Sequence, residues 1–169
     1  MNQNKQAFTL IELLVVVLII GILAAVAVPQ YQKAVLKSRY ATLKNLVESL
    51  AQAEEVHYIA IGNYTTDWET LDISIPSSPI KDVDCGIAGN NGYWNVFCTI
   101  KKDGLDFLAY QIHLMHSVLG SRRQCNSYQD TDLSAIQSRI CAEETKRTTP
   151  SSVISTSDGI KHIYWVYLS

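Results

Sequence analysis

The sequence has 169 residues, enough for one ordinary domain and a long terminal element. Its 14 Lys and Arg nearly balance its 16 Asp and Glu, and the formal net charge of −2 argues against a dedicated nucleic-acid-binding protein. The charges are unevenly distributed, because none lies between Leu13 and Val28.

This uncharged N-terminal segment predicts a helix that spans a membrane. Twelve of the 16 residues from Leu13 to Val28 are Leu, Ile or Val. As a helix, residues 8–28 would extend about 31 Å, which is enough to cross a hydrocarbon core. The aliphatic side chains favour insertion by roughly 4 to 7 kcal/mol, whereas Glu12 near the end opposes it by about 3 kcal/mol or less. An ionisable residue in such a span is a candidate functional residue; the alternative is that Glu12 stays solvated among the lipid headgroups.

The string Ala7-Phe8-Thr9-Leu10-Ile11-Glu12-Leu13 resembles the processing site of type IV prepilins and type II secretion pseudopilins. The resemblance implies that residues 1–7 are a leader, that a prepilin peptidase cuts the Ala7–Phe8 bond, and that the new Phe8 amine is methylated. It also implies that Glu12 pairs with the Phe8 amine of a neighbouring subunit, and that Pro29 is the proline at which family helices kink. The family usually has Gly before the cut, so Ala7 is a departure, and we expect processing to survive it.

A secretory signal peptide is the competing interpretation of the same segment. Ala25-Val26-Ala27 fits an A-x-A cleavage pattern, and a cut there would release a secreted protein. Against it, the apolar run is long, Glu12 interrupts its approach and Pro29 closely follows the cut. Lys and Arg are more frequent after the span than before it, which by the positive-inside rule opposes a cytoplasmic N-terminus. The resemblance and the cysteines nevertheless place the head in the periplasm.

After Pro29 the pattern becomes amphipathic. Apolar residues recur at steps of three and four, with Leu46 and Ala53 alongside, and the main series is Leu36, Tyr40, Leu43, Val47 and Leu50. Gly62-Asn63 is a helix stop. We therefore predict one helix from Phe8 to about Ile61, bent near Pro29, whose second half needs a head packed along it.

The remaining sequence predicts a head of antiparallel strands. Strands are expected at Tyr93 to Ile100, Leu105 to Leu114 and Ile160 to Leu168, the first two joined by a tight Asp103-Gly104 turn. A short helix is expected over Asp130 to Glu144, and Thr148 to Asp158 is expected to be a loop.

Four cysteines lie in the second half of the chain, and their spacing contains no C-x₂-C zinc pattern. An even count behind a membrane-directing segment indicates disulfides, although four buried free thiols remain the alternative. Of three connectivities we favour Cys85–Cys98 and Cys125–Cys141, because both close short local loops. By resemblance, residues 63–84 are the αβ-loop, Cys85–Cys98 fastens this loop to the first strand, and Cys125–Cys141 closes the C-terminal variable region.

The search for catalytic or metal-binding residues gives weak candidates. His113 and His116 would point to opposite faces of a strand, and His57 lies beside Glu54 on the helix. Asp130 and Asp132 resemble the paired aspartates of oxygen-rich calcium-binding loops. However, no D-x-D-x-D-G series follows them, and helix capping explains them equally well. We expect no metal, no cofactor and no enzymatic activity.

Two further groups of side chains are given structural roles. Trp94 and Trp165 are interpreted as core or interface aromatics. The pairs Lys101-Lys102 and Arg122-Arg123 are interpreted as solvated turns, although contact with DNA in an uptake pilus is a lesser alternative.

The sequence thus predicts an α+β, pilin-like fold: a long N-terminal helix packed against a small antiparallel sheet. Its parts are the leader at 1–7, the membrane and assembly half at 8–29, the amphipathic half at 30–62 and the head at 63–169. The resemblance implies a subunit stored in the inner membrane with its head in the periplasm. An inner-membrane assembly platform then polymerises it, with itself and other pilins, into a surface pilus or a periplasmic pseudopilus. The alternative function is a membrane-anchored or secreted periplasmic binding module or enzyme.

Overall fold

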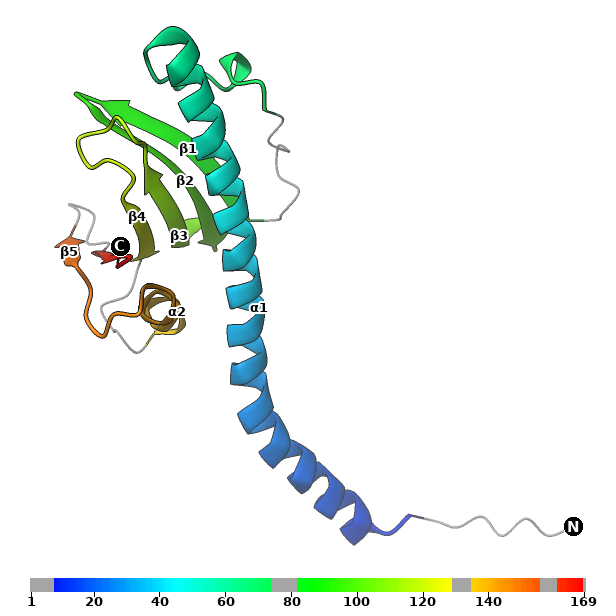
Figure 1. The fold of residues 1–169 in the computed structure, drawn as a ribbon. Helices are drawn as coiled ribbons and strands as arrows, with labels where there is room; N and C mark the ends of the chain where they lie inside the picture. The colour runs from blue at the N-terminus through cyan, green and yellow to red at the C-terminus, as the bar shows by residue number, and fades with distance from the viewer. Residues whose placement is uncertain (1–7, 74–81, 129–134, 156–160, 169) are drawn as a thin grey trace, which may run out of the picture. The chain divides into compact units, whose positions relative to one another are not determined.

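The computed structural model describes residues 8–73, 82–128, 135–155 and 161–168 (Figure 1). The chain divides into two compact units, Met1–Leu36 and Lys37–Ser169. Helix α1 (Leu10–Ile61) begins in the first unit and ends in the second. The predicted leader, residues 1–7, lies outside the described residues.

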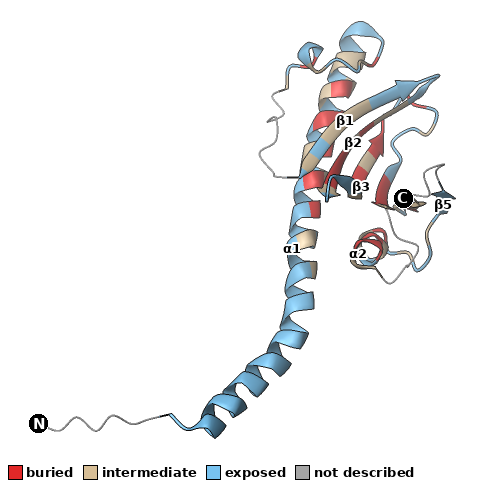
Figure 2. Cartoon of the chain, turned by 180° about the vertical axis from the view of Figure 1, so that it is seen from behind, coloured by how far each residue is buried: buried red, intermediate tan, exposed pale blue. Residues whose placement is uncertain are grey.

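The first unit consists of the start of α1. Its residues are exposed along the whole apolar stretch, as Figure 2 shows in pale blue. The helix continues through Pro29, although a proline inside a helix removes one backbone hydrogen bond. The helical assignment confirms the prediction for this segment, and the proposed kink at Pro29 stays a prediction.

In the second unit, α1 buries the stripe that its sequence periodicity predicted. Tyr40, Leu43, Val47 and Leu50 are fully buried at steps of three and four residues. Figure 2 shows buried positions of this part of α1 in red. The helix ends where expected, because Gly62 adopts a positive φ of 85° and its N–H donates to the Tyr58 carbonyl at 2.7 Å. Within this unit, α1 therefore supplies a large part of the hydrophobic core.

The head contains a six-stranded antiparallel sheet in the order β1-β2-β3-β4-β6-β5 (Figure 1). The strands are β1 (Val83–Asn90), β2 (Tyr93–Lys102), β3 (Leu105–His113), β4 (Arg123–Tyr128), β5 (Ser152–Ser155) and β6 (Lys161–Val166). The α+β fold predicted from the sequence is therefore confirmed.

The β2–β3 hairpin forms where the Asp-Gly pair predicted it. Asp103 and Gly104 both have positive φ, 54° and 80°, as a two-residue hairpin loop with a type I′ turn requires. The strands place Val96, Cys98 and Ile100 of β2 opposite Ile112, Tyr110 and Leu108 of β3, and all six are buried. These cross-strand pairs form the centre of the sheet's contribution to the core.

Three strands were not predicted. The residues assigned to a loop at Thr148 to Asp158 include β5, which is short, exposed and paired with β6. Central strand β4 was missed because it is polar, yet Asn126 is buried and donates to the Gln111 side chain at 3.0 Å, and the Ser127 and Ser138 hydroxyls lie 3.1 Å apart.

Strand β1 was missed as well. Its Cys85 stands directly opposite Cys98, so this disulfide joins two paired strands and does not fasten a loop to a strand.

The second disulfide joins the sheet to helix α2 (Ile136–Thr145). Cys125 of β4 is bonded to Cys141 of α2, and both are fully buried. The structure thus has the two pairings favoured from the sequence. The predicted helix was to start at Asp130, but α2 begins at Ile136, and Asp130 and Asp132 lie outside the described residues.

Glu54 is an ionisable side chain buried between α1 and the segment that follows it. Its side chain is fully buried; Oε2 accepts the Thr65 N–H at 3.3 Å, and Oε1 has no partner among the described residues. Burial raises the pKa of the Glu54 carboxyl because the charged form loses hydration.

This raised pKa predicts a pH-dependent stability. The folded chain binds the Glu54 proton more tightly than the unfolded chain does. The stability that this proton contributes is fully present below the pKa of Glu54 in the unfolded chain, and it is lost as the pH rises through the higher pKa of Glu54 in the folded chain. Glu54→Gln should therefore raise the urea midpoint relative to the unmodified chain at pH 7, by an amount that shrinks towards about pH 4. Exposed Glu69 supplies the control, and a pH-independent difference for Glu54→Gln would contradict the assignment.

Candidate functional site

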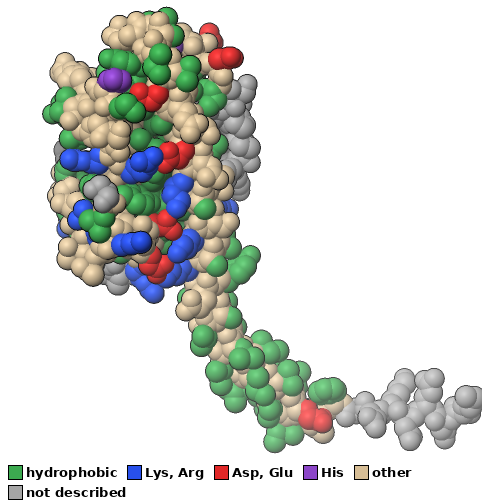
Figure 3. Space-filling model, viewed as in Figure 1, with side chains coloured by type: hydrophobic (Ala, Val, Ile, Leu, Met, Phe, Trp, Pro, Cys, Tyr) green, Lys and Arg blue, Asp and Glu red, His purple; other side chains and the backbone are tan. Residues whose placement is uncertain are grey.

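The candidate site is the start of α1, which presents an exposed apolar surface. Phe8, Leu10 and Ile11 are 78%, 81% and 69% exposed. An 18-residue window of this helix has a mean hydropathy of 3.1, and none of it is buried within the chain. By length and composition α1 is the one helix among the described residues able to cross a membrane. Figure 3 shows its start covered with hydrophobic side chains.

So large an apolar surface requires an environment from outside the chain. Exposed apolar patches of soluble monomers rarely exceed a few hundred Å². A lipid bilayer satisfies this helix because its backbone groups bond within the helix and its side chains are apolar. Packing against the same segment of other copies satisfies it equally.

Glu12 caps the first turn of its own helix. Its Oε2 accepts the Thr9 N–H at 2.8 Å and the Thr9 hydroxyl at 2.7 Å, while the Glu12 N–H donates to the Thr9 Oγ1 at 3.3 Å. With Thr9 at the N-cap and Glu12 three residues on, this is the reciprocal capping box. The T-x-x-E pattern was present in the sequence, and it is the signal that the sequence analysis overlooked.

The capping box leaves part of the Glu12 carboxylate available. Both accepted bonds use Oε2, and Oε1 has no hydrogen-bond partner among residues 8–73 or elsewhere in the described chain. The carboxylate lies at the positive end of the helix dipole, which favours its ionised form. It can therefore accept a further donor without giving up the cap.

The predicted cleavage point lies immediately before this capped turn. Phe8 is exposed and non-helical, and Ala7 lies outside the described residues. All the groups of the capping box belong to residues 9–12, downstream of the Ala7–Phe8 bond. A cut at that bond would leave the helix start intact.

Within the second unit, charged contacts fasten α1 to the head, and Figure 3 shows acidic and basic side chains interspersed over this face. Arg123 of β4 holds Glu48 with two bonds, Nε to Oε1 at 3.0 Å and a second guanidinium nitrogen to Oε2 at 3.2 Å. The Arg123 hydrogen bond lowers the pKa of Glu48. Lys44 pairs with Glu144 of α2, and Lys37 lies 3.5 Å from Glu143. These pairs join α1 to both β4 and α2.

The histidines singled out from the sequence occupy separate environments. His113 is buried, whereas the His116 ring stacks on Tyr58 with centroids 4.2 Å apart. His57 Nδ1 lies 2.9 Å from the Asn63 carbonyl oxygen, so this nitrogen carries the proton and donates. No group of three or more His, Cys, Asp or Glu able to hold a metal occurs among the described residues.

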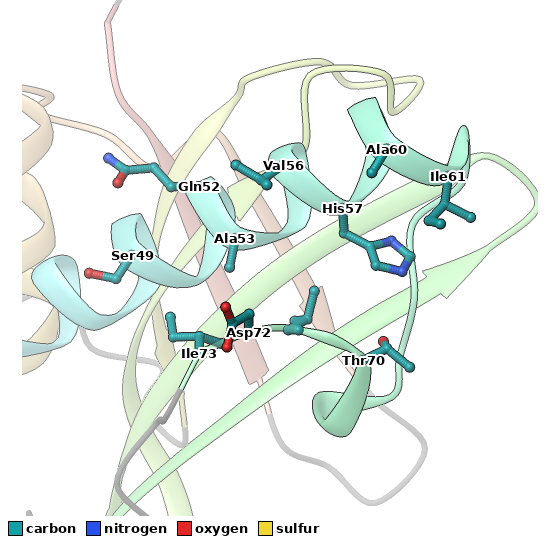
Figure 4. Close-up of a pocket in the computed structure, with 11 residues that line it drawn as sticks. Ser49, Gln52, Ala53, Val56, His57, Ala60, Ile61, Thr70, Asp72 and Ile73 are labelled. Carbon is teal, nitrogen blue, oxygen red and sulfur yellow. The ribbon is translucent and has the colours of Figure 1, made fainter.

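A groove of about 840 Å³ lies between α1 and the following segment of the head (Figure 4). Val56, Ala60 and Ile61 contribute apolar side chains from the helix, and Asp72 and Ile73 line it from the other element. The His57 nitrogen that could serve as a donor is already engaged by a carbonyl. Among the described lining residues, the Ser49 hydroxyl donates to the Asn45 carbonyl and the Thr70 hydroxyl to the Asp67 carbonyl.

The other predicted residues have structural positions. Trp165 is buried in the core and Trp94 packs against Tyr64, with ring centroids 5.7 Å apart. Lys101 pairs with Asp84 at 2.8 Å across the β1–β2 ladder. Arg123 belongs to the Glu48 contact and is not a freely solvated turn residue, contrary to the prediction.

Comparison with known proteins agrees with this architecture. The profile of the prokaryotic N-terminal methylation motif matches residues 2–28. The chain is 34% identical over 107 residues to fimbrial protein EcpC of Eikenella corrodens, covering 62% of this chain and 69% of EcpC. It is 36% identical over 81 residues to the type IV major pilin protein PilE1 of Neisseria gonorrhoeae. The chain belongs to the type IV pilin family.

The similarity is concentrated in part of the chain. The match to PilE1 covers 48% of this chain and 49% of that pilin, and a match to the type IV major fimbrial protein FimA of Dichelobacter nodosus is 56% identical over 39 residues, 23% of this chain and 25% of FimA. No solved structure matches the chain.

The capping box makes a specific prediction for the first turn of α1. Thr9→Ala removes the N-cap hydroxyl and should destabilise this turn by about 1 kcal/mol, which corresponds to roughly fivefold faster exchange of its amide protons. Amide exchange of the full chain in detergent micelles measures this. Thr9→Ser keeps the hydroxyl and should leave the rates nearly unchanged. Equal rates in Thr9→Ala and the unmodified chain would exclude a capping role.

Proposed function

We propose that this chain is a structural subunit that is cut at Ala7–Phe8, methylated on the Phe8 amine and stored in the inner membrane with its head in the periplasm. An assembly platform then polymerises it into a pilus-like fibre. The observation that carries the proposal is the exposed apolar start of α1, headed by a capped carboxylate at Glu12. Membership of the type IV pilin family supports it.

The apolar surface accounts for both storage and assembly. In the membrane, lipid covers the segment from Leu10 to Val28. In the fibre, the same segments of neighbouring copies cover one another, which excludes lipid and water together. The driving force is then packing of aliphatic side chains, because lipid tails are as apolar as the segment itself.

Glu12 and Phe8 set the axial position of each subunit in this proposal. An ammonium and a carboxylate in an apolar environment each lose hydration, and pairing compensates both. The Phe8 amine of an incoming copy can bond Glu12 Oε1 while Oε2 keeps its bonds to Thr9. A subunit displaced along the fibre axis would leave both charges unpaired, so the contact selects one register.

The processing proposal is tested by the mass of the mature N-terminal peptide from membrane or sheared-fibre fractions. We expect a start at Phe8 carrying one methyl group. A start at Val28 would identify a secreted protein released by signal peptidase. An intact Met1 would show that the leader is retained, and either result would overturn the polymerising-subunit proposal.

The register proposal is tested by Glu12→Gln. This variant keeps an oxygen that can accept the Thr9 bonds but loses the charge that attracts the Phe8 ammonium. We expect normal cleavage and membrane insertion, with incorporation into sheared fibres reduced by at least tenfold. Quantification of the chain in membrane and fibre fractions measures this, and undiminished incorporation would show that Glu12 acts only as a helix cap.

A further inference from the structure

The head contains a second pocket, of about 540 Å³, that the assembly function does not use. It lies within the second unit and is built from three stretches of chain: the loop that leads into β4 together with the first residue of β4, the turn after α2, and the end of β6 with the residues that follow it. These three stretches are far apart in the sequence. They bring three arginines, Arg122, Arg123 and Arg147, to one lining.

The three guanidinium groups are held in different ways. Arg123 is neutralised by its two bonds to Glu48. The Arg147 Nε donates to the Val166 carbonyl, which orients this side chain and leaves its terminal nitrogens uncommitted among the described residues. The Arg122 side chain has no hydrogen-bond or ion-pair partner within the described parts of the chain. The pocket thus presents two arginine charges that no described carboxylate offsets.

None of the described residues that line the pocket is acidic. Its other polar groups are the Ser121 and Tyr167 side chains, and Leu119 and Leu168 add apolar surface. Burial raises the pKa of Tyr167 to about 12, so its phenol stays protonated at neutral pH. A concave surface whose described lining carries two uncommitted positive charges and no carboxylate favours an anionic ligand.

The chemistry of arginine narrows the class of anion. Each guanidinium presents several N–H donors in a rigid plane, and this arrangement pairs with oxyanions through two parallel hydrogen bonds. The two uncommitted guanidinium groups of Arg122 and Arg147 can together hold a tetrahedral oxyanion, because phosphate or sulfate offers a pair of acceptor oxygens to each of them. The volume lies within the range of small-molecule pockets and leaves room for an organic group attached to the anion.

We propose that this pocket binds the phosphate or sulfate group of an anionic ester. Arg147 and Arg122 contact the oxyanion, and Arg123 supports the site from its contact with Glu48. The same chemistry is offered by a free phosphate or sulfate ester and by the headgroup of an anionic phospholipid.

The test uses the full chain in neutral detergent micelles, labelled with ¹⁵N. Inorganic phosphate and sulfate are titrated against chloride at matched ionic strength, and the Nε–H resonances of the arginines are followed. We expect saturable shifts at Arg122 and Arg147 with phosphate or sulfate and none with chloride. Arg147→Gln should weaken the apparent affinity by about tenfold or more, the effect of losing a charge-assisted contact.

Two variants separate the site from general charge effects. Arg139→Gln removes the same charge from an exposed position of α2 outside the pocket and should leave the affinity unchanged. Arg147→Lys keeps the charge but loses the planar fork, and it should bind more weakly than the unmodified chain. Equal loss in Arg139→Gln and Arg147→Gln, or chloride shifts as large as those of phosphate, would overturn the proposal.

A final pair of conditions identifies the source of the anion. The chain is placed in bilayer discs of phosphatidylcholine alone or with phosphatidylglycerol. Shifts at Arg122 and Arg147 that require phosphatidylglycerol indicate a lipid headgroup, whereas shifts with inorganic phosphate in phosphatidylcholine discs indicate a free ester. If neither condition shifts these resonances but Arg147→Gln abolishes fibre formation, the pocket is instead a contact with another subunit and the proposal is wrong.

Discussion

The constraint on which the rest of the structure depends is an apolar surface that the chain cannot bury by itself. The residues from Leu10 to Val28 are exposed along their whole length, so their stability comes from lipid or from other copies. Other features of the chain stabilise the helix that carries this surface or anchor it in the head. A capping box closes the helix at the end where its N–H groups lack partners, and the continuation of the same helix is anchored in a disulfide-bonded head. The exposed segment is thus joined through one continuous helix to a folded head.

Apolar and polar contacts both hold α1 in the head, but they contribute different amounts of stability. Tyr40, Leu43, Val47 and Leu50 supply the larger part, because each fully buried aliphatic or aromatic side chain contributes on the order of 2 kcal/mol. The charged contacts of Lys37 and Lys44 with α2 are partly exposed, and pairs of this kind contribute about 1 kcal/mol or less. These pairs add specific contacts between α1 and α2, as the Arg123–Glu48 pair does between α1 and β4.

Elements with a strong local pattern were predictable, and elements defined by distant partners were not. The helix from Leu10 to Ile61 and the hairpin at Asp103-Gly104 follow from periodicity and turn chemistry. Strand β4 has the composition of a surface segment and is central only because Gln111 and Ser138 satisfy its polar side chains. At the candidate site, Glu12 was identified by resemblance while its bond to Thr9 was overlooked. The arginine pocket could not be predicted, because its charges come from two segments that lie far apart in the sequence, Arg122-Arg123 and Arg147.

The order of strands has a consequence for how the head folds. Strands β1 to β4 each pair with their neighbour in sequence, so they can form as successive hairpins in chain order. The last two strands reverse this order, since β6 lies between β4 and β5. Among the described strands β5 pairs only with β6, and it therefore cannot join the sheet until β6 has paired with β4. Completion of the sheet therefore depends on β6, and a chain without β6 would expose the edge of β4.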